Sequence, residues 1–130
     1  MMNVTQSQEN SKVPVTVYHI TGPLNADEPL TGMAREAYQN GTRNILLDLT
    51  ETTYISSAGL RAIQSMYNIL RDKEESADMV NTGIRAGSYH SPHLKLCKPS
   101  KLVQEVLRVS GFEMFLEIHD SVKKGVESFG

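Results

Sequence analysis

The chain has 130 residues, with 13 Lys and Arg against 15 Asp and Glu, and its formal net charge of −2 leaves no basic excess for nucleic-acid binding. No apolar run approaches the length of a membrane span, and the polar N-terminus does not resemble a signal peptide. The single cysteine, Cys97, excludes an internal disulfide and a cysteine-rich zinc site. We therefore expect one soluble cytoplasmic domain that contacts neither nucleic acid nor membrane directly.

The N-terminal part of the chain shows a strand pattern followed by a helix pattern. Val13–Ile20 is β-branched and alternating, which predicts a strand, and Val4–Gln6 is a candidate short edge strand beside it. Gly22-Pro23 is then expected to end the strand. Apolar residues at helical spacing from Leu30 to Tyr38, followed by Asn40-Gly41, predict a helix and its C-terminal end.

The central part repeats this order. The run Asn44–Thr50 (Asn-Ile-Leu-Leu-Asp-Leu-Thr) is short and almost continuously apolar, which is typical of a central strand covered on both faces. After an expected loop at Glu51–Ile55, an apolar stripe from Leu60 to Leu70 predicts a second helix. This helix is expected to begin at Ser56-Ser57, because both residues are good N-caps.

A third unit follows near the C-terminus. Leu94–Leu96 predicts a strand, and Pro99-Ser100 opens a helix that Gly111 ends. Met114–Ile118 is predicted to form a last short strand, and Asp120 is predicted to cap a final helix.

Strands that alternate with helices predict an α/β fold with a central, mostly parallel sheet of four to five strands and helices packed against it. We expect residues 13–130 to form this single domain after a polar N-terminal segment, residues 1–12. Asp72–Pro92 carries charge and glycines without sustained periodicity, so we interpret it as an inserted surface loop. In a loose loop, limited proteolysis is expected to cut first near Arg85. The competing interpretation assigns Met79-Val80 to a short extra strand and predicts resistance to cleavage at Arg85.

Two adjacent serines, Ser56 and Ser57, lie between a buried strand and the first turn of a helix. Free backbone N–H groups and the helix dipole attract anions at such a position. A serine there can be a cap, a nucleophile or a phosphate acceptor. A nucleophile elbow requires Gly-x-Ser-x-Gly, but around Ser57 only the second glycine, Gly59, is present, and no histidine lies in a recognisable setting. This pattern does not favour a serine hydrolase.

The segment Asp48–Arg61, and within it Ile55–Arg61 (Ile-Ser-Ser-Ala-Gly-Leu-Arg), resembles the signature of the STAS domain, specifically that of bacterial anti-sigma factor antagonists. That family shows an Asp-Ser-Ser-Gly-Leu or Asp-Ser-Ala-Gly-Leu core. Alignment on Gly59-Leu60 places the phosphorylated serine of the family at Ser57, with Ser56 as the alternative. The aspartate that precedes this serine in the family falls on Ser56, so this chain lacks that charge.

The resemblance extends beyond the serine motif. Gly22–Asn25 (Gly-Pro-Leu-Asn) looks like the turn that follows the family's opening strand, and Lys95–Glu105 with Val109–Ile118 resembles its final helix and strand. It covers most of the chain apart from Asp72–Pro92. The resemblance implies a STAS-type fold.

The resemblance also implies a function in partner switching. The unphosphorylated protein would bind an anti-sigma factor with serine kinase activity, which uses its own ATP to phosphorylate it, and a PP2C-type phosphatase would reset it. The resemblance implies that the protein is a substrate and a ligand rather than an enzyme, with no cofactor and no metal of its own. The implied phosphorylation site is Ser57, and the implied partner-binding residues are Asn25, Asp27, Thr53, Tyr54, Ser56, Ser57, Gly59, Leu60 and Arg61.

Two alternatives remain open from the residues. Asp48 and Lys98-Pro99 superficially resemble the phosphoacceptor and Lys-Pro pair of receiver domains, but the neighbouring acids Asp27-Glu28 lie too far beyond the first strand to match the acidic pair that holds Mg²⁺ there. Alternatively, the chain is the STAS module of a signalling complex without a sigma factor. The simpler interpretation of Asp48 is a strand-end carboxylate that binds local backbone groups.

The remaining polar residues have simpler structural interpretations. The four histidines and the one cysteine show no metal-ligand spacing. Lys95, Lys98 and Lys101 are expected to form a solvated face. Cys97 lies within a strand pattern and is expected to be a small buried or half-buried side chain rather than a reactive thiol.

Overall fold

In the computed structural model, residues 2–71 and 90–130 are described, and strands alternate with helices along most of them. The strands are β1 (Asn3–Asn10), β2 (Pro14–Leu24), β3 (Ile45–Asp48), β4 (Thr52–Ile55), β5 (Leu94–Cys97) and β6 (Ile118–His119). The helices are α1 (Leu30–Gln39), α2 (Ser57–Leu70), α4 (Lys101–Val109) and α5 (Val122–Glu127), with a 3₁₀ helix η1 (Phe112–Met114).

The described strands form one mixed sheet in the order β1-β2-β3-β5-β6, with β4 paired to the C-terminal end of β2. β1 runs antiparallel to β2, and every other pair is parallel. This confirms the predicted α/β fold with a mostly parallel sheet. The sheet has six strands rather than four to five, because β4 lies where the sequence predicted a loop.

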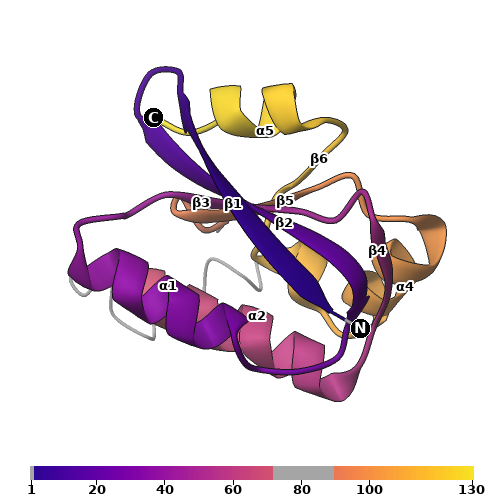
Figure 1. The fold of residues 1–130 in the computed structure, drawn as a ribbon. Coiled ribbons are helices and arrows are strands. Elements are labelled where there is room, and N and C mark those ends of the chain that lie inside the picture. Colours follow the sequence, from indigo (N-terminus) through magenta and orange to yellow (C-terminus); the bar gives the residue numbers. More distant parts are fainter. Residues whose placement is uncertain (1, 72–89) are drawn as a thin grey trace.

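Helices cover both faces of the sheet (Figure 1). On one face, α1, α2 and α4 enclose the larger core, which includes Leu47 and Met66. On the other face, α5 and the residues after it pack a smaller core that includes Leu46 and Phe129. Because successive strand residues point to opposite faces, β3 buries Ile45, Leu46 and Leu47 completely. The interpretation of this run as a central strand is confirmed.

β1 is longer than the predicted edge strand Val4–Gln6. It pairs with β2 along its whole length, and side chains add to this pairing: Gln8 and Thr16 exchange two hydrogen bonds of 2.9 and 3.1 Å. Its polar residues conceal the strand period in the sequence, because most of them are exposed at the edge of the sheet.

The prediction that Gly22-Pro23 ends the second strand is wrong. β2 continues to Leu24, and its register with β4 shifts between Gly22 and Leu24. Gly22 has φ 85°, a backbone conformation that glycine adopts readily, so the strand bends there without breaking. The segment Glu51–Ile55, predicted as a loop, contains β4, which at four residues is too short to show a period.

The predicted strand Met114–Ile118 is also wrong. Its beginning belongs to η1, and β6 comprises only the two residues after Glu117. Phe115, which lies within the predicted strand, packs its ring edge-on against the rings of Tyr67 and Phe112, with centroids 5.0 and 5.5 Å apart.

Helix ends follow local capping chemistry. α1 ends at Gln39 with Asn40 as its C-cap, and Gly41 follows with φ 102°, which agrees with the predicted end. Ser100 and Ser121 each accept a hydrogen bond from the backbone amide three residues later, at 3.2 and 3.1 Å, and cap α4 and α5. The predicted cap of the last helix, Asp120, is therefore off by one residue.

No helix within residues 2–71 and 90–130 is both long and apolar enough to cross a membrane.

The predicted inserted loop, Asp72–Pro92, lies almost wholly outside the described residues, as do the alternative strand at Met79-Val80 and the cleavage site at Arg85. At the end of this segment, Ser91 is buried. Its hydroxyl accepts hydrogen bonds from the backbone amides of His93, at 3.3 Å, and of Leu94, at 3.2 Å, at the start of β5.

Candidate functional site

The predicted site residues come from two segments: the loop after β2, and the segment that runs from β4 into α2. In the register of β2 with β4, Leu24 lies beside Ile55, and the amide of Ser56 donates a hydrogen bond to the Leu24 carbonyl at 3.0 Å. The hydroxyl of Thr52 donates to the carbonyl of Ile20 at 2.9 Å. These bonds bring the two segments together at one end of the sheet.

The two serines have different positions at the start of α2. Ser56 is the N-cap: its backbone is extended (φ −96°, ψ 177°), and its Oγ accepts a hydrogen bond from the Gly59 amide at 3.3 Å. Ser57 is the first helical residue, is exposed, and makes no side-chain hydrogen bond with the described part of the chain. The Ser56 hydroxyl is therefore engaged in capping α2, whereas the Ser57 hydroxyl is accessible to another protein.

The beginning of α2 favours an anion. Its first turn contains no acidic residue, so the partial positive charge of the helix N-terminus is not offset there by a carboxylate of that turn. Backbone N–H groups in the first turn of a helix lack intrahelical partners, and they stabilise negative charge placed beside them. A phosphate on Ser57 would thus be electrostatically compatible with the helix.

Gly59 determines how closely α2 approaches β2. A Cβ at this position would lie 2.1 Å from the Leu24 carbonyl oxygen and 2.9 Å from its carbon. A Cβ essentially never lies this close to a non-bonded atom, so the helix can approach the strand this closely only with glycine at position 59. Gly59 is buried, and this packing accounts for a glycine at its place in the serine motif.

The other predicted residues are accessible. Tyr54, at the end of β4, is 43% exposed. Arg61 approaches Asp27 across the junction between the two segments, with 3.9 Å between Nε and Oδ2. The residues of the predicted set that are exposed or half-buried are Asn25, Asp27, Thr53, Tyr54, Ser56, Ser57, Leu60 and Arg61.

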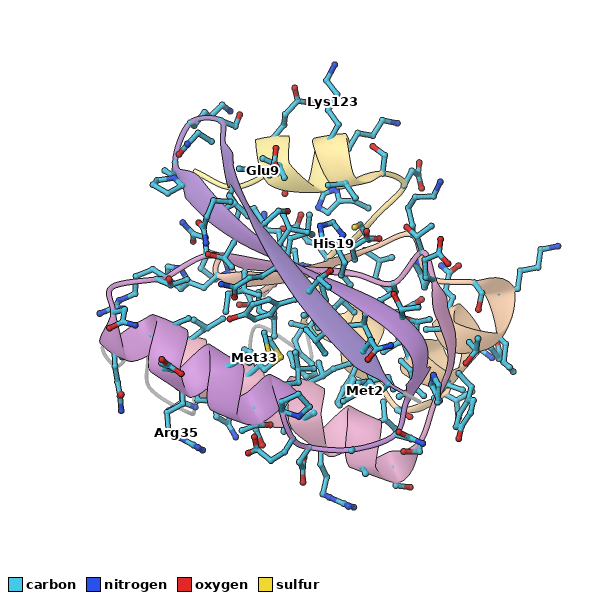
Figure 2. All side chains as sticks on the ribbon, in the orientation of Figure 1. Met2, Glu9, His19, Met33, Arg35 and Lys123 are labelled. Atoms are coloured by element: carbon cyan, nitrogen blue, oxygen red, sulfur yellow. The ribbon has the colours of Figure 1, made fainter. Side chains whose placement is uncertain are left out.

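A histidine-centred group lies on the opposite, α5 face of the sheet, where Figure 2 shows His19. His19 Nδ1 lies 2.7 Å from Asp48 Oδ2, and its Nε2 lies 3.0 Å from the hydroxyl of Ser7. The expectation that no histidine has a recognisable setting is therefore wrong. The parallel register of β2 with β3 creates this contact by placing His19 beside Asp48, and single-sequence periodicity does not reveal register.

Asp48 acts as the predicted strand-end carboxylate. Its Oδ1 accepts hydrogen bonds from the amide of Thr50, at 3.0 Å, and from the Thr50 hydroxyl. Burial tends to raise the pKa of Asp48, but the hydrogen bonds from Thr50 and His19 together outweigh burial and hold the pKa below its usual value. Both carboxylate oxygens are engaged, which does not favour the receiver-like alternative, in which Asp48 would accept a phosphoryl group.

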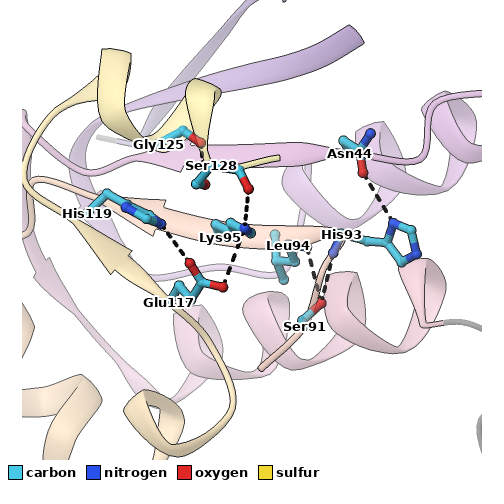
Figure 3. Close-up of polar contacts among 9 residues, drawn as sticks. All are labelled: Asn44, Ser91, His93, Leu94, Lys95, Glu117, His119, Gly125 and Ser128. Atoms are coloured by element: carbon cyan, nitrogen blue, oxygen red, sulfur yellow. Dashed lines mark hydrogen bonds and ion pairs between the residues drawn. The ribbon is translucent and has the colours of Figure 1, made fainter. Parts of the chain in front are cut away.

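Lys95 is buried on the same face, contrary to the prediction of a solvated lysine cluster (Figure 3). Its Nζ donates a hydrogen bond to the Ser128 carbonyl at 3.0 Å, lies 3.4 Å from Glu117 Oε2, and sits 4.8 Å from the ring centroid of Phe129. Glu117 also contacts His119, at 3.0 Å. The C-terminal residues close over this lysine, and the other two lysines of the predicted cluster are exposed.

Cys97 is fully buried, as predicted. Burial, with the nearby charge of Asp48, raises the pKa of the Cys97 thiol to about 12. The thiol is therefore protonated and unreactive at neutral pH. Within residues 2–71 and 90–130, no three His, Cys, Asp or Glu side chains are grouped so that they could hold a metal ion.

Solved structures share this fold. A candidate anti-sigma factor antagonist from Thermotoga maritima aligns with a TM-score of 0.64 at 17% identity, over 94% of this chain and 92% of that chain. The unphosphorylated form of the anti-sigma factor antagonist SpoIIAA aligns with a TM-score of 0.58 at 15% identity, over 92% of each chain. The phosphorylated form of SpoIIAA, a Bacillus cell fate determinant, gives 0.60 at 15% identity, over 95% and 97%.

Sequence comparison gives the family. No curated protein matches the chain. The family model of the STAS domain matches residues 5–83, which is more than half of the chain and includes both segments of the candidate site. The chain therefore belongs to the STAS domain family and has the fold of anti-sigma factor antagonists.

Proposed function

We propose that this STAS domain is an anti-sigma factor antagonist whose partner binding is switched off by phosphorylation of Ser57. The observation that supports this most directly is the accessible Ser57 hydroxyl at the first residue of α2, beside the capping Ser56. The serine lies within the segment that resembles the phosphorylation motif of these antagonists. The partner is an anti-sigma factor that is also a serine kinase, and it binds the chain when Ser57 is unmodified.

The physical basis of the switch is the charge of the phosphate. Phosphorylation adds about −1.5 to −2 charges at pH 7 and three strong acceptor oxygens. At the start of α2 this charge is locally favourable, so the fold is retained. The cost falls on docking, because a dianion in the contact surface must lose its water or face acidic groups of the partner.

The roles are divided among three proteins. The kinase supplies the ATP, a PP2C-type phosphatase removes the phosphate, and the chain is their substrate and binds no cofactor of its own. It catalyses no reaction. Its place of action is the cytoplasm of a bacterial cell, where the anti-sigma factor acts.

The first test maps the phosphorylated residue. The chain is incubated with Mg-ATP and each purified serine-kinase anti-sigma factor encoded in the same genome, and phosphopeptides are identified by mass spectrometry. We expect phosphate on Ser57 in the unmodified chain and in Ser56→Ala, and none in Ser57→Ala. Ser56→Ala removes the cap and costs about 1 kcal/mol of stability, so its folding is checked by circular dichroism. Phosphate on Ser56 alone would contradict the proposal, and so would the absence of phosphorylation by every one of these kinases.

The second test measures binding by calorimetric titration with the same kinase. Ser57→Ala is expected to bind as the unmodified chain does, and Ser57→Asp to bind more weakly, although one carboxylate carries less charge than a phosphate. Asn68→Asp adds the same charge to an exposed position near the other end of α2 and is expected to bind normally. Equal affinities of all three variants would remove the electrostatic explanation.

A further inference from the structure

Arg61 makes the charged contact between the two segments of the site. Its Nε lies 3.9 Å from Asp27 Oδ2, and both side chains are largely exposed, at 67% and 45%. The second carboxylate oxygen, Asp27 Oδ1, is buried and has no hydrogen-bond partner within residues 2–71 and 90–130. An exposed ion pair at this distance contributes little stability. The Asp27–Arg61 contact can therefore be exchanged easily for a stronger one.

Ser57 is placed to offer that stronger contact. Ser57 and Arg61 are four residues apart in α2, so their side chains share one face of the helix. The favourable order places the anion on the N-terminal member of such a pair and the cation on the C-terminal member. A phosphate carries more charge than a carboxylate, and its oxygens match the fork of an arginine guanidinium.

We infer that phosphorylation of Ser57 transfers Arg61 from Asp27 to the phosphate, an inference that rests on the proposed function of Ser57. In the unmodified chain Arg61 remains with Asp27 and is available to a partner. In the phosphorylated chain Arg61 binds the phosphate, and the Asp27 carboxylate loses its cation.

The exchange changes both segments of the site at once. A partner that docks over them loses access to the positive charge of Arg61. It also meets an unpaired carboxylate in the loop after β2, in addition to the phosphate. Phosphorylation thus leaves the negative charge of Asp27 uncompensated in the loop after β2, although the modified residue lies in α2.

The test uses phosphoserine incorporated at position 57 during translation, so it needs no kinase. The second pKa of the phosphate, ordinarily about 6, is measured by phosphorus-31 NMR titration. Arg61 stabilises the dianion, so Arg61→Gln is expected to raise this pKa by about 0.3 units or more, and Arg61→Lys to raise it less. Lys123→Gln removes one positive charge on α5, across the sheet (Figure 2), and is expected to leave it unchanged.

A double-mutant cycle separates the exchange from simple charge effects. Asp27→Asn removes the competitor for Arg61, so it is expected to lower the pKa of the phosphate more when Arg61 is present than in Arg61→Gln. Phosphorylation is also expected to shift the backbone amide signals of residues 25–28 in the wild-type chain and less in Arg61→Gln. An unchanged phosphate pKa in Arg61→Gln, or additive effects in the cycle, would overturn the inference. Neither result depends on whether a kinase recognises Ser57, so failure of the proposed function would be seen separately.

Discussion

Replacement of Gly59 by alanine is expected to separate α2 from the end of β2. The new Cβ would lie 2.1 Å from the Leu24 carbonyl oxygen, and this oxygen already accepts a hydrogen bond from the Ser56 amide. Overpacking of this kind costs about 1–3 kcal/mol, and loss of the hydrogen bond costs about 1 kcal/mol more. The better helix propensity of alanine returns at most about 1 kcal/mol. We expect a net loss of about 2 kcal/mol.

Urea denaturation followed by circular dichroism measures this change, with Gly32→Ala as the matched control. At Gly32 the added Cβ would contact the end of the exposed Glu28 side chain, 2.7 Å away, and that side chain can move. Gly32→Ala is therefore expected to remain within about 1 kcal/mol of the wild type. Because the shift in α2 also moves Ser57, Gly59→Ala should be phosphorylated more slowly. A stability of Gly59→Ala equal to that of the wild type would refute the steric argument.

Three further predictions concern the α5 face of the sheet. Lys95→Ala is expected to lower the free energy of unfolding by about 2 kcal/mol or more, because it leaves a cavity and removes the donor to the Ser128 carbonyl. Lys95→Met fills the space and is expected to lower it less. Urea denaturation compares the two variants. The pKa of Asp48 is lowered in the folded chain, so its contribution to stability is present above the unfolded value of about 3.9 and is lost as pH falls through the folded value. Asp48→Asn should therefore be less stable than the wild type at pH 7, and the difference should shrink on acidification below pH of about 4; an unchanged difference would contradict the shift. The thiol of Cys97 has a pKa of about 12, so it should react with iodoacetamide at neutral pH only when the chain is unfolded. Mass spectrometry detects the alkylation. Rapid alkylation of the native protein would contradict the prediction and show that the thiol is accessible.

Much of the fold is predictable because local sequence patterns match the strands and helices that the structure contains. The apolar run of β3 indicates a strand covered on both faces, and the stop at Asn40-Gly41 indicates the end of α1. Two of the errors concern short elements. β4 has four residues and β6 has two, too few to show a period, and both are held by pairing with distant strands rather than by local propensity.

The candidate site is predictable in part. Motif spacing identifies the serine pair, and alignment on Gly59-Leu60 favours Ser57. Which of the two hydroxyls caps α2 is shown only by the structure, where Ser56 does so. The setting of His19 and the burial of Lys95 could not be predicted. Both depend on strand register and on the C-terminal residues that pack over the sheet, and these are long-range features that local patterns do not contain.

The most direct test of phosphorylation-controlled binding compares two forms of one protein. The kinase anti-sigma factor that phosphorylates the chain is titrated calorimetrically with the unmodified chain and with the chain that carries phosphoserine at position 57, without ATP. We predict that the phosphorylated form binds at least about tenfold more weakly, a difference of about 1.4 kcal/mol, while its circular dichroism spectrum remains that of the unmodified chain. Equal dissociation constants for the two forms would contradict the proposed switch.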